Sequence, residues 1–341
     1  MLQLNKNGVY IIAELSANHN HNLDVALKSV QAAAEAGANA IKLQTYTPDT
    51  ITIDCDNEYF RLNHGTIWDG QTLYDLYKQA YTPWEWHNAL FAEAKKCGID
   101  CFSTPFDFTA VDFLEQFNPP AYKIASFEIF DIPLIEKVAK LGKPIIISTG
   151  LATEEDITEA VNACHRMNNY QIALLKCTSS YPAPIENVNL LTIPDMKLRF
   201  DCEVGLSDHT LGITSPIVSV ALGARIIEKH FIIDKSIGGP DAAFSLDKNE
   251  FALMVKHVRE AEKALGKVNY QLDEKAKQSK KLARSLFVVK DIQENEILTP
   301  ENIRSIRPGY GMHPKYYTEV LGKKANKMLK KGTPLRWEDI V

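Results

Sequence analysis

The sequence predicts an α/β protein, a (β/α)8 TIM barrel followed by a small β-rich domain. Short β-rich runs, each followed by a longer stretch of helical period, alternate eight times over residues 1–266. Eight strand–helix units favour a barrel over an open doubly wound sheet. No GxGxxG follows the first run and the sequence has no Walker motif, which counts further against a nucleotide-binding open sheet.

Each predicted strand is a short run rich in β-branched and other apolar residues. In chain order, the predicted strands are residues 9–16, 40–46, 100–106, 121–128, 144–150, 172–182, 203–209 and 226–233. The helical stretches that follow them are residues 23–37, 83–98, 109–117, 132–142, 153–167, 187–200, 215–224 and 249–266. An irregular excursion through residue 80 separates the second strand from its helix. Thr153 and Asp156 form a capping-box pattern at the start of the fifth helix.

The sequence divides into two parts after the eighth unit. Residues 267–283 are charged and lack an apolar stripe, so we expect a linker or a surface helix there, followed by the second domain at residues 284–341. Residues 1–266 carry 22 basic and 34 acidic side chains, whereas residues 267–341 carry 16 and 9. This asymmetry is explained either by docking of the basic segment on an acidic barrel, its own or a neighbour's, or by a solvated lysine-rich surface.

Composition and charge exclude several classes of protein. A net charge of −5 gives no general reason to expect binding to nucleic acid or to a membrane. The first residues lack the layout of a signal peptide, and no apolar run approaches the ~18 residues that would span a bilayer. The six cysteines show no CxxC spacing and are expected to be reduced thiols, so we expect a cytoplasmic protein.

Every predicted strand ends on polar residues, and in a (β/α)8 barrel the active site is built at these carboxyl ends. Because side chains alternate with period two along a strand, Lys42 and Gln44 are expected to share one face, as are Ser126 and Glu128. A lone serine or histidine at a strand end is more often structural than functional. The prediction of a single pocket therefore depends on the whole set: Glu14, Lys42, Gln44, Thr104, Lys123, Ser126, Glu128, Ser148, Ser179, Tyr181, Ser207, His209, Glu228 and His230.

The residue types in this set indicate two kinds of chemistry. Two inward lysines, Lys42 and Lys123, together with several hydroxyl groups can cradle a phosphate or a carboxylate. His209 and His230, on adjacent strands, can hold one divalent metal and leave coordination positions open for Lewis-acid activation of a carbonyl. The HNH pattern at residues 19–21 is also found in metal-dependent amidohydrolases, but their further histidines are missing from strands five and six, so we set that interpretation aside.

Several segments together resemble the sialic acid synthases. They are IIAELSANHN, AIKLQTY, CFSTPF, AYKIASFE, IISTG, KCTSSYP, GLSDHTLG, EKHF, GPDAAFSLD, ARSL and IRPGYG, and they run from residue 11 to about residue 311. Enzymes of this family condense phosphoenolpyruvate with an acetamido sugar to give a nonulosonic acid and phosphate. They pair a (β/α)8 barrel with a C-terminal antifreeze-like (SAF) domain, so the resemblance implies both the fold and the activity.

Within the family, ELSANH and KLQTYTPDT favour the pseudaminic acid branch, whose sugar substrate is 2,4-diacetamido-2,4,6-trideoxy-L-altrose. The N-acetylneuraminate and legionaminic acid synthases are the alternatives among enzymes. From a different class, the alternative is a non-catalytic sugar-binding protein that retains the barrel. Ser179 stands where the sialic acid branch usually has an asparagine in contact with phosphoenolpyruvate, and a serine can still donate a hydrogen bond to an anion.

The resemblance also implies a role for each candidate site residue. Glu14 is the catalytic carboxylate, which positions or deprotonates a water. The residues implied at the phosphoenolpyruvate site are Lys42, Thr104, Lys123, Ser126, Ser148, Ser179, Tyr181 and Ser207. Those implied at the sugar are Gln44, Glu128, Asp241 and Arg307. His209 and His230 are implied to bind Mn²⁺ or Mg²⁺, with Co²⁺ as a further option. The family forms domain-swapped homodimers, in which Arg307 would reach the site of a neighbouring subunit, although the sequence allows docking in cis equally well.

Overall fold

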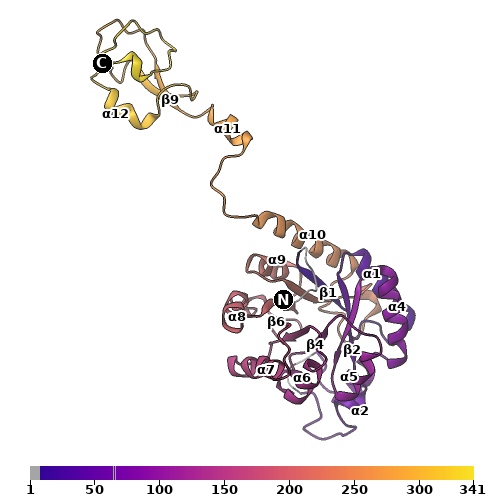
Figure 1. Ribbon diagram of the computed structural model, residues 1–341. Helices are drawn as coiled ribbons and strands as arrows, with labels where there is room; N and C mark the ends of the chain where they lie inside the picture. The colour runs from indigo at the N-terminus through magenta and orange to yellow at the C-terminus, as the bar shows by residue number, and fades with distance from the viewer. Residues whose placement is uncertain (1–7, 64, 66) are drawn as a thin grey trace. The chain divides into compact units, whose positions relative to one another are not determined.

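The computed structural model describes residues 8–63, 65 and 67–341 of the chain, which fall into two compact units, Met1–Gly266 and Lys267–Val341 (Figure 1). The first unit contains eight parallel strands in the order β3-β2-β1-β8-β7-β6-β5-β4. β3 and β4, at the two ends of this order, are in contact, so the sheet curves round into the predicted barrel. The strands are β1 (Tyr10–Glu14), β2 (Ala40–Thr45), β3 (Asp100–Pro105), β4 (Tyr122–Ile124), β5 (Ile145–Ser148), β6 (Ile172–Cys177), β7 (Glu203–Asp208) and β8 (Ile226–His230).

One helix follows each strand and covers the outside of the sheet (Figure 1). These helices are α1 (Leu23–Glu35), α4 (His87–Cys97), α5 (Phe108–Glu115), α6 (Ile132–Ala139), α7 (Glu154–Arg166), α8 (Thr192–Phe200), α9 (Thr214–Ala221) and α10 (Lys248–Leu265). The excursion after β2 contains two more helices, α2 (Pro48–Ile51) and α3 (Leu73–Ala80). The predicted capping box at the start of α7 is present, since the Thr153 side chain accepts a hydrogen bond from Asp156 N and the Asp156 side chain accepts one from Thr153 N.

Successive side chains of a strand point to opposite faces of the sheet, so each strand contributes to two apolar cores. Outward-facing residues such as Ile11, Ile41 and Ile147 pack against the helices. Inward-facing residues form a separate apolar cluster inside the barrel, which includes Ile12, Ala40, Phe102, Ile146, Leu175 and Ile226. Two residues farther along each strand, the inward-facing side chains become polar. The apolar cluster is therefore the floor of a polar layer at the carboxyl end of the barrel.

Two of the predicted strands extend too far. The sixth, expected over residues 172–182, ends at Cys177, so Ser179 and Tyr181 lie in the loop beyond it. The fourth strand was expected over residues 121–128, with Ser126 and Glu128 on one face, but β4 ends at Ile124. The chain then turns, and Glu128 begins a short 3₁₀ helix, Glu128–Phe130. Ser126 and Glu128 therefore do not alternate along a strand, and their positions have to be taken from the loop itself. Other 3₁₀ helices lie at Trp84–Trp86, Ile185–Asn187, Lys235–Ile237, Pro314–Tyr316 and Trp337–Asp339.

The second unit is small and β-rich. Its strands β9 (Ser285–Val288) and β10 (Ile303–Ile306) pair antiparallel, with Ile303 opposite Val288. They cover a compact apolar core of their own, which includes Leu286, Ile292, Leu298, Val320, Leu329 and Leu335. The unit also contains α12 (Tyr317–Val320) and α11 (Glu274–Lys280), and no residue of α11 is buried. α11 falls within the predicted linker or surface helix at residues 267–283.

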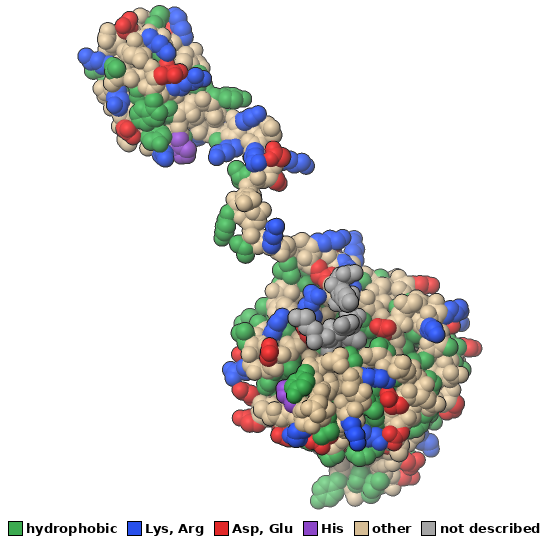
Figure 2. All heavy atoms as spheres, viewed as in Figure 1, with side chains coloured by type: hydrophobic (Ala, Val, Ile, Leu, Met, Phe, Trp, Pro, Cys, Tyr) green, Lys and Arg blue, Asp and Glu red, His purple; other side chains and the backbone are tan. Residues whose placement is uncertain are grey.

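The surface of the barrel unit is mixed in charge. Figure 2 shows acidic and basic side chains interspersed over the face in view. Within the described part of the chain, no helix combines the length and the apolar character that crossing a membrane requires.

Candidate active site

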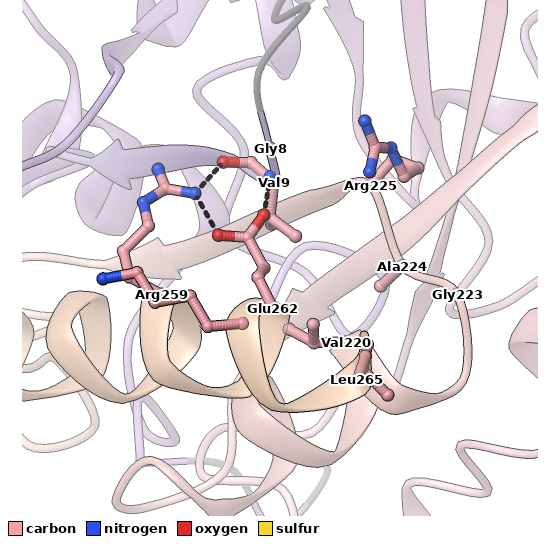
Figure 3. Close-up of a pocket in the computed structure, with 10 residues that line it drawn as sticks. Gly8, Val9, Val220, Gly223, Ala224, Arg225, Arg259, Glu262 and Leu265 are labelled. Carbon is pink, nitrogen blue, oxygen red and sulfur yellow. Dashed lines mark hydrogen bonds and ion pairs between the residues drawn. The ribbon is translucent and has the colours of Figure 1, made fainter. Parts of the chain in front are cut away.

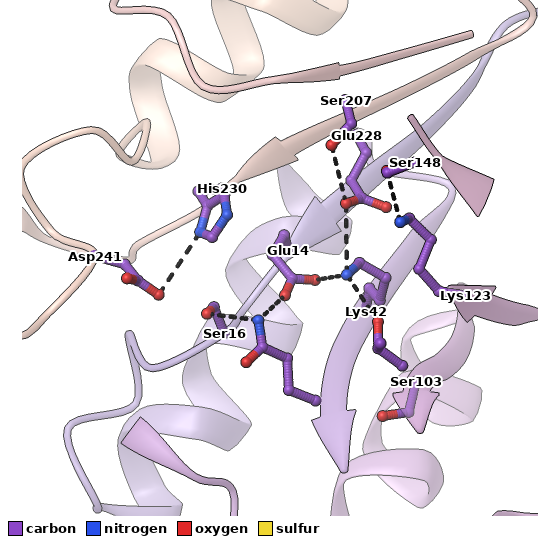
Figure 4. A network of polar contacts seen from close by, with 12 residues as sticks. Glu14, Ser16, Lys42, Ser103, Lys123, Ser148, Ser207, Glu228, His230 and Asp241 are labelled. Atoms are coloured by element: carbon purple, nitrogen blue, oxygen red, sulfur yellow. Dashed lines mark hydrogen bonds and ion pairs between the residues drawn. The ribbon is translucent and has the colours of Figure 1, made fainter. Parts of the chain in front are cut away.

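A polar layer fills the carboxyl end of the barrel, directly above the apolar floor (Figure 4). Its side chains come from the inward-facing positions at the ends of the strands, because each lies two residues beyond a floor residue or continues that face. The predicted site residues that the structure brings together in this way are Glu14, Lys42, Thr104, Lys123, Ser148, Ser207 and His230. All seven are buried.

The centre of the layer is Lys42, which lies between two carboxylates. Its Nζ is 2.9 Å from Glu14 Oε2 and 3.5 Å from Glu228 Oε1. It also donates a hydrogen bond to Thr104 Oγ1 at 3.2 Å. Gln44 Nε2 donates to Glu14 Oε1 at 2.9 Å and so fixes the second oxygen of that carboxylate. The charge of Lys42 is therefore largely satisfied within the protein.

The three charges in this cluster respond differently to burial. Burial raises the pKa of Glu14 to about 7, although Lys42 opposes the rise. Burial also acts against ionised Glu228, but Lys42 and Lys123 outweigh it and hold the pKa of Glu228 below its usual value. Burial opposes the charge of Lys42 too, yet the two carboxylates raise its pKa. At neutral pH, Lys42 and Glu228 are thus charged while Glu14 can accept or release a proton.

Lys123 is a buried ammonium group of a different kind. Its Nζ donates to Ser148 Oγ at 2.6 Å and to the backbone oxygen of Ile124 at 2.7 Å. Among the described residues, no carboxylate lies within ion-pair distance of it. Burial consequently lowers the pKa of Lys123 to about 8. A buried cation without a counterion is costly, so this position is suited to a ligand that brings negative charge.

Hydroxyl groups converge beside Lys123 at the ends of β4, β5 and β6. Ser126 Oγ accepts a hydrogen bond from Gly150 N at 3.1 Å, and Ser179 Oγ lies 3.9 Å from Cys177 Sγ. A Cβ atom at Gly150 would come within 2.2 Å of Ser179 Oγ and 2.9 Å of Ser126 Oγ. A side chain here would displace the two predicted serines, because their hydroxyls occupy the space that a Cβ atom would need.

The two predicted metal ligands lie next to each other. The ring centroids of His209 and His230 are 5.4 Å apart, and Tyr181 packs on His209 at 4.3 Å. His209 Nδ1 donates to the backbone oxygen of Thr178 at 3.0 Å, so Nε2 is the ring atom that can face a ligand. Burial opposes the charged form of this ring, but Cys177 and the Thr178 carbonyl outweigh it and raise the pKa of His209, so a cation would have to displace a proton from Nε2. His230 Nδ1 is buried, has no hydrogen-bond partner within the described part of the chain, and lies 3.8 Å from Asp241 Oδ2.

These histidines fit a divalent cation. Burial and the neighbouring His209 hold the pKa of His230 well below its usual range, so this ring is neutral and keeps a lone pair. Behind the histidines, Lys229 Nζ and Asp208 Oδ2 form a fully buried ion pair of 2.5 Å. Lys229 also donates to the backbone oxygen of Thr210. This pair ties the end of β7 to the end of β8 and so fixes the spacing of the two rings.

The residues implied at the sugar divide into two groups. Gln44 and Asp241 adjoin the central cluster: Gln44 donates to Ser16 Oγ at 2.9 Å, and Asp241 Oδ2 accepts from Ala17 N at 3.3 Å. Glu128 lies in the β4 loop, where burial raises its pKa to about 7 and its Oε2 has no hydrogen-bond partner within the described residues. Arg307 is an exposed residue of the second unit, so its role at the sugar stays a prediction.

Sequence reasoning noted Glu228 at a strand end but gave it no role in the site. The structure places its carboxylate 3.5 Å from Lys42 Nζ and within 3.4 Å of Ser207 Oγ. The signal was present, because Glu228 lies two residues before His230 and shares its inward face. Cys177 and Ser16, which contact His209 and Gln44, were also not expected in the site.

A cavity lies at the other end of the barrel, where β1 and β8 begin; Figure 3 shows the residues that line it. Its volume is about 540 Å³, and its lining includes Val9, Arg225, Arg259 and Glu262. Arg259 Nη1 donates to Val9 O at 2.8 Å and to Glu262 Oε2 at 2.9 Å, so this guanidinium is already engaged. The amino-terminal face of such barrels usually contributes stability rather than catalysis. We therefore place the functional site at the polar layer.

Comparison with known proteins identifies the family to which the chain belongs. The model of the NeuB family matches residues 29–270, and that of the SAF domain matches residues 283–341. The chain is 51% identical to a pseudaminic acid synthase of Campylobacter jejuni, over 97% of this chain and 96% of that protein. It is 49% identical to a pseudaminic acid synthase of Helicobacter pylori, over 97% of both chains.

The chain is also similar in structure to a sialic acid synthetase. The N-acetylneuraminic acid (sialic acid) synthetase of Leptospira borgpetersenii, in complex with citrate, matches with a TM-score of 0.70 and 33% identity, over 80% of this chain and 90% of that chain. The fold and the polar layer thus define a barrel enzyme of the sialic acid synthase type. The chain belongs to the NeuB family, and the resemblance noted in the sequence is confirmed.

The Lys42 cluster generates a prediction about stability. Replacing Lys42 by Met leaves Glu14 and Glu228 facing each other in a buried layer, which should cost roughly 3–5 kcal/mol of unfolding free energy near pH 8. Because both carboxylates then have raised pKa values in the folded state, stability is lost as pH rises and the deficit should shrink near pH 5.5. Chemical unfolding at the two pH values measures this difference.

The matched control is Lys137→Met. Lys137 pairs with Asp112 at 2.7 Å on the surface, where an ion pair contributes about 0–1 kcal/mol. Equal losses in the two variants, or a Lys42→Met deficit that does not change with pH, would contradict the view that Lys42 neutralises the buried carboxylates.

Proposed function

We propose that this protein is a pseudaminic acid synthase, which condenses phosphoenolpyruvate with 2,4-diacetamido-2,4,6-trideoxy-L-altrose to give pseudaminic acid and phosphate. The observation that carries the proposal is the buried Lys123 ammonium without a carboxylate partner, beside hydroxyl donors at the mouth of a barrel. The choice of sugar is supported by the relatives of that name at 49–51% identity, whereas an N,N′-diacetyllegionaminic acid synthase of C. jejuni is 36% identical.

The anionic substrate is proposed to lie against Lys123. Its phosphate and carboxylate oxygens can accept hydrogen bonds from the Lys123 ammonium and from the hydroxyls of Ser126, Ser148 and Ser179. Thr104, Tyr181 and Ser207 complete the proposed phosphoenolpyruvate site, with Lys42 at its edge. Because these groups are held by strands and by one another, they orient the substrate with little rearrangement.

Glu14 is proposed to act on water. C3 of phosphoenolpyruvate attacks the aldehyde carbon of the open-chain sugar, a C–C bond forms, and the aldehyde oxygen takes up a proton. Water then adds at C2 and gives its proton to Glu14, whose pKa of about 7 makes it a suitable acceptor. The bond between C2 and the bridging oxygen of the phosphate then breaks, and phosphate leaves with that oxygen. The C2 hydroxyl loses its proton and becomes the ketone.

His209 and His230 are proposed to hold a divalent cation, Mn²⁺ or Mg²⁺, with Co²⁺ as a further option. The adjacent rings and the unpartnered, buried His230 Nδ1 support this assignment. A bound cation would polarise the carbonyl oxygen of the aldehyde as a Lewis acid. Asp241, 3.8 Å from His230, and Gln44 are proposed to face the sugar from the same side.

We further propose a domain-swapped homodimer in the cytoplasm. All six cysteines are free thiols, which supports a reducing compartment. Small domains of this size bury little core alone, which favours docking on a partner surface. In such a dimer Arg307 would reach the sugar of the neighbouring subunit.

The proposed substrate is tested by phosphate release with a panel of sugars. We expect kcat/KM for the diacetamido altrose to exceed that for N-acetylmannosamine and for the legionaminic acid precursor by at least about tenfold. Comparable efficiency on N-acetylmannosamine would overturn the choice of sugar. Binding of phosphoenolpyruvate without phosphate release from any sugar would indicate a non-catalytic binding protein instead.

The metal site predicts that a chelator abolishes turnover and that Mn²⁺, Mg²⁺ or Co²⁺ restores it. His209→Ala should weaken Mn²⁺ binding by more than about 100-fold, measured by equilibrium dialysis, and reduce activity in parallel. His257→Ala on α10, a surface histidine paired with Glu260, is the control and should change neither. Undiminished Mn²⁺ binding in His209→Ala would refute the assignment.

The swapped dimer predicts complementation between two inactive variants, Glu14→Ala and Arg307→Ala. After subunit exchange in an equal mixture, one site of each heterodimer has both residues intact, so activity should recover to about one quarter of the wild-type value. Recovery is measured as phosphate release, with exchange verified by native mass spectrometry. Complete exchange without recovery would place Arg307 in cis or outside the site.

A further inference from the structure

A cavity of about 300 Å³ at the mouth of the barrel differs in chemistry from the charged centre. Its lining includes Asn20, His21, Trp68, Gln71, Gln79 and Pro240. None of the described residues that line it is Asp, Glu, Lys or Arg. The cavity combines amide groups, an imidazole and an indole, and at this volume it is at the small end of the range for ligand sites.

The cavity adjoins the proposed sugar site. Pro240 precedes Asp241, and Asp241 accepts a hydrogen bond from Ala17 N, just before Asn20 and His21. Two segments that line the cavity therefore border Asp241, the carboxylate near His230, where the sugar is proposed to bind.

Trp68 lines the cavity and also contacts Tyr181 of the catalytic centre. Its ring packs against Tyr181 with centroids 5.6 Å apart, and its Nε1 donates to Pro240 O at 3.2 Å. Trp68 belongs to the excursion after β2, whereas Tyr181 follows β6, and these strands lie opposite each other in an eight-stranded barrel. The excursion thus reaches across the mouth of the barrel. Its indole contacts Tyr181, which in turn packs on His209.

The lining matches a neutral amide ligand. Gln79 Nε2 donates to Gln71 Oε1 at 3.4 Å, which leaves the Gln71 amide group as a donor and the Gln79 oxygen as an acceptor. An acetamido group supplies one acceptor, one donor and a methyl group, and the indole and Leu76 can contact the methyl. A phosphate or carboxylate would lose its hydration here without gaining a cation, so the cavity disfavours phosphoenolpyruvate.

We propose that this cavity binds the acetamido group at C4 of the sugar and that Gln71 and Gln79 determine specificity for it. The inference rests on the proposed function and adds a substrate-binding subsite to it. The C2 acetamido group is attached next to the reacting aldehyde carbon and stays near Glu14 and the histidines. The C4 group is two bonds farther along the carbon chain, and the cavity lies next to Asp241 and beside Trp68.

The test combines variants with a change in the sugar. kcat/KM is measured for the diacetamido altrose and for an analogue with a hydroxyl in place of the C4 acetamido group. Gln71→Ala and Gln79→Ala should each lose about 3- to 10-fold with the diacetamido sugar, through KM for the sugar, and less than about twofold with the analogue. KM for phosphoenolpyruvate should not change. Gln79 is exposed on α3, so its variant is expected to fold normally.

The matched control is Lys78→Ala, which is exposed on the same helix but does not line the cavity, and both sugars should be used as by the wild type. Equal losses with the two sugars, or no loss, would overturn the cavity assignment while the proposed function stands, provided that the wild type uses the diacetamido sugar. Absence of wild-type turnover would overturn both.

Discussion

The site depends on the buried Lys123 ammonium, which has no carboxylate partner within the described part of the chain. Lys42 is neutralised between Glu14 and Glu228, so its charge is used within the protein. Among the residues that the structure describes, Lys123 is held only by a serine hydroxyl and a backbone oxygen. A buried ammonium in this environment favours the binding of an anion, because the anion supplies a negative charge next to it. The layer is therefore suited to an anionic substrate, such as the phosphoenolpyruvate proposed for it.

The barrel places the structural and the polar parts of this site in different layers. The inward-facing apolar floor supports the polar layer, and the outward-facing Asp208–Lys229 pair ties together the strands that present His209 and His230. At the mouth, charged groups and neutral amides occupy different regions, which suits one anionic and one neutral substrate. In the proposed function, each region would favour its own substrate because the other substrate lacks the matching hydrogen-bonding or charged groups.

Much of this could be predicted from the sequence, because the period of a strand is fixed. Alternation put Lys42 and Gln44 on one face, and both lie in the cluster around Glu14; the comparisons confirm the fold and family. The same rule failed for Ser126 and Glu128, since β4 ends at Ile124 and a loop has no period. Trp68 could not be predicted at all, because its contacts join loops that are more than 100 residues apart in sequence.

The affinity for phosphoenolpyruvate as a function of pH, measured by calorimetry without sugar, tests the role of Lys123 most directly. With a pKa of about 8, Lys123 is charged at lower pH and loses its proton above it, so affinity should hold near pH 7 and fall progressively above about pH 8. Lys123→Arg should bind without this fall, because a guanidinium stays charged. Affinity that is constant to about pH 9.5 in the wild type, or equal in Lys123→Arg and Lys123→Met, would contradict the account.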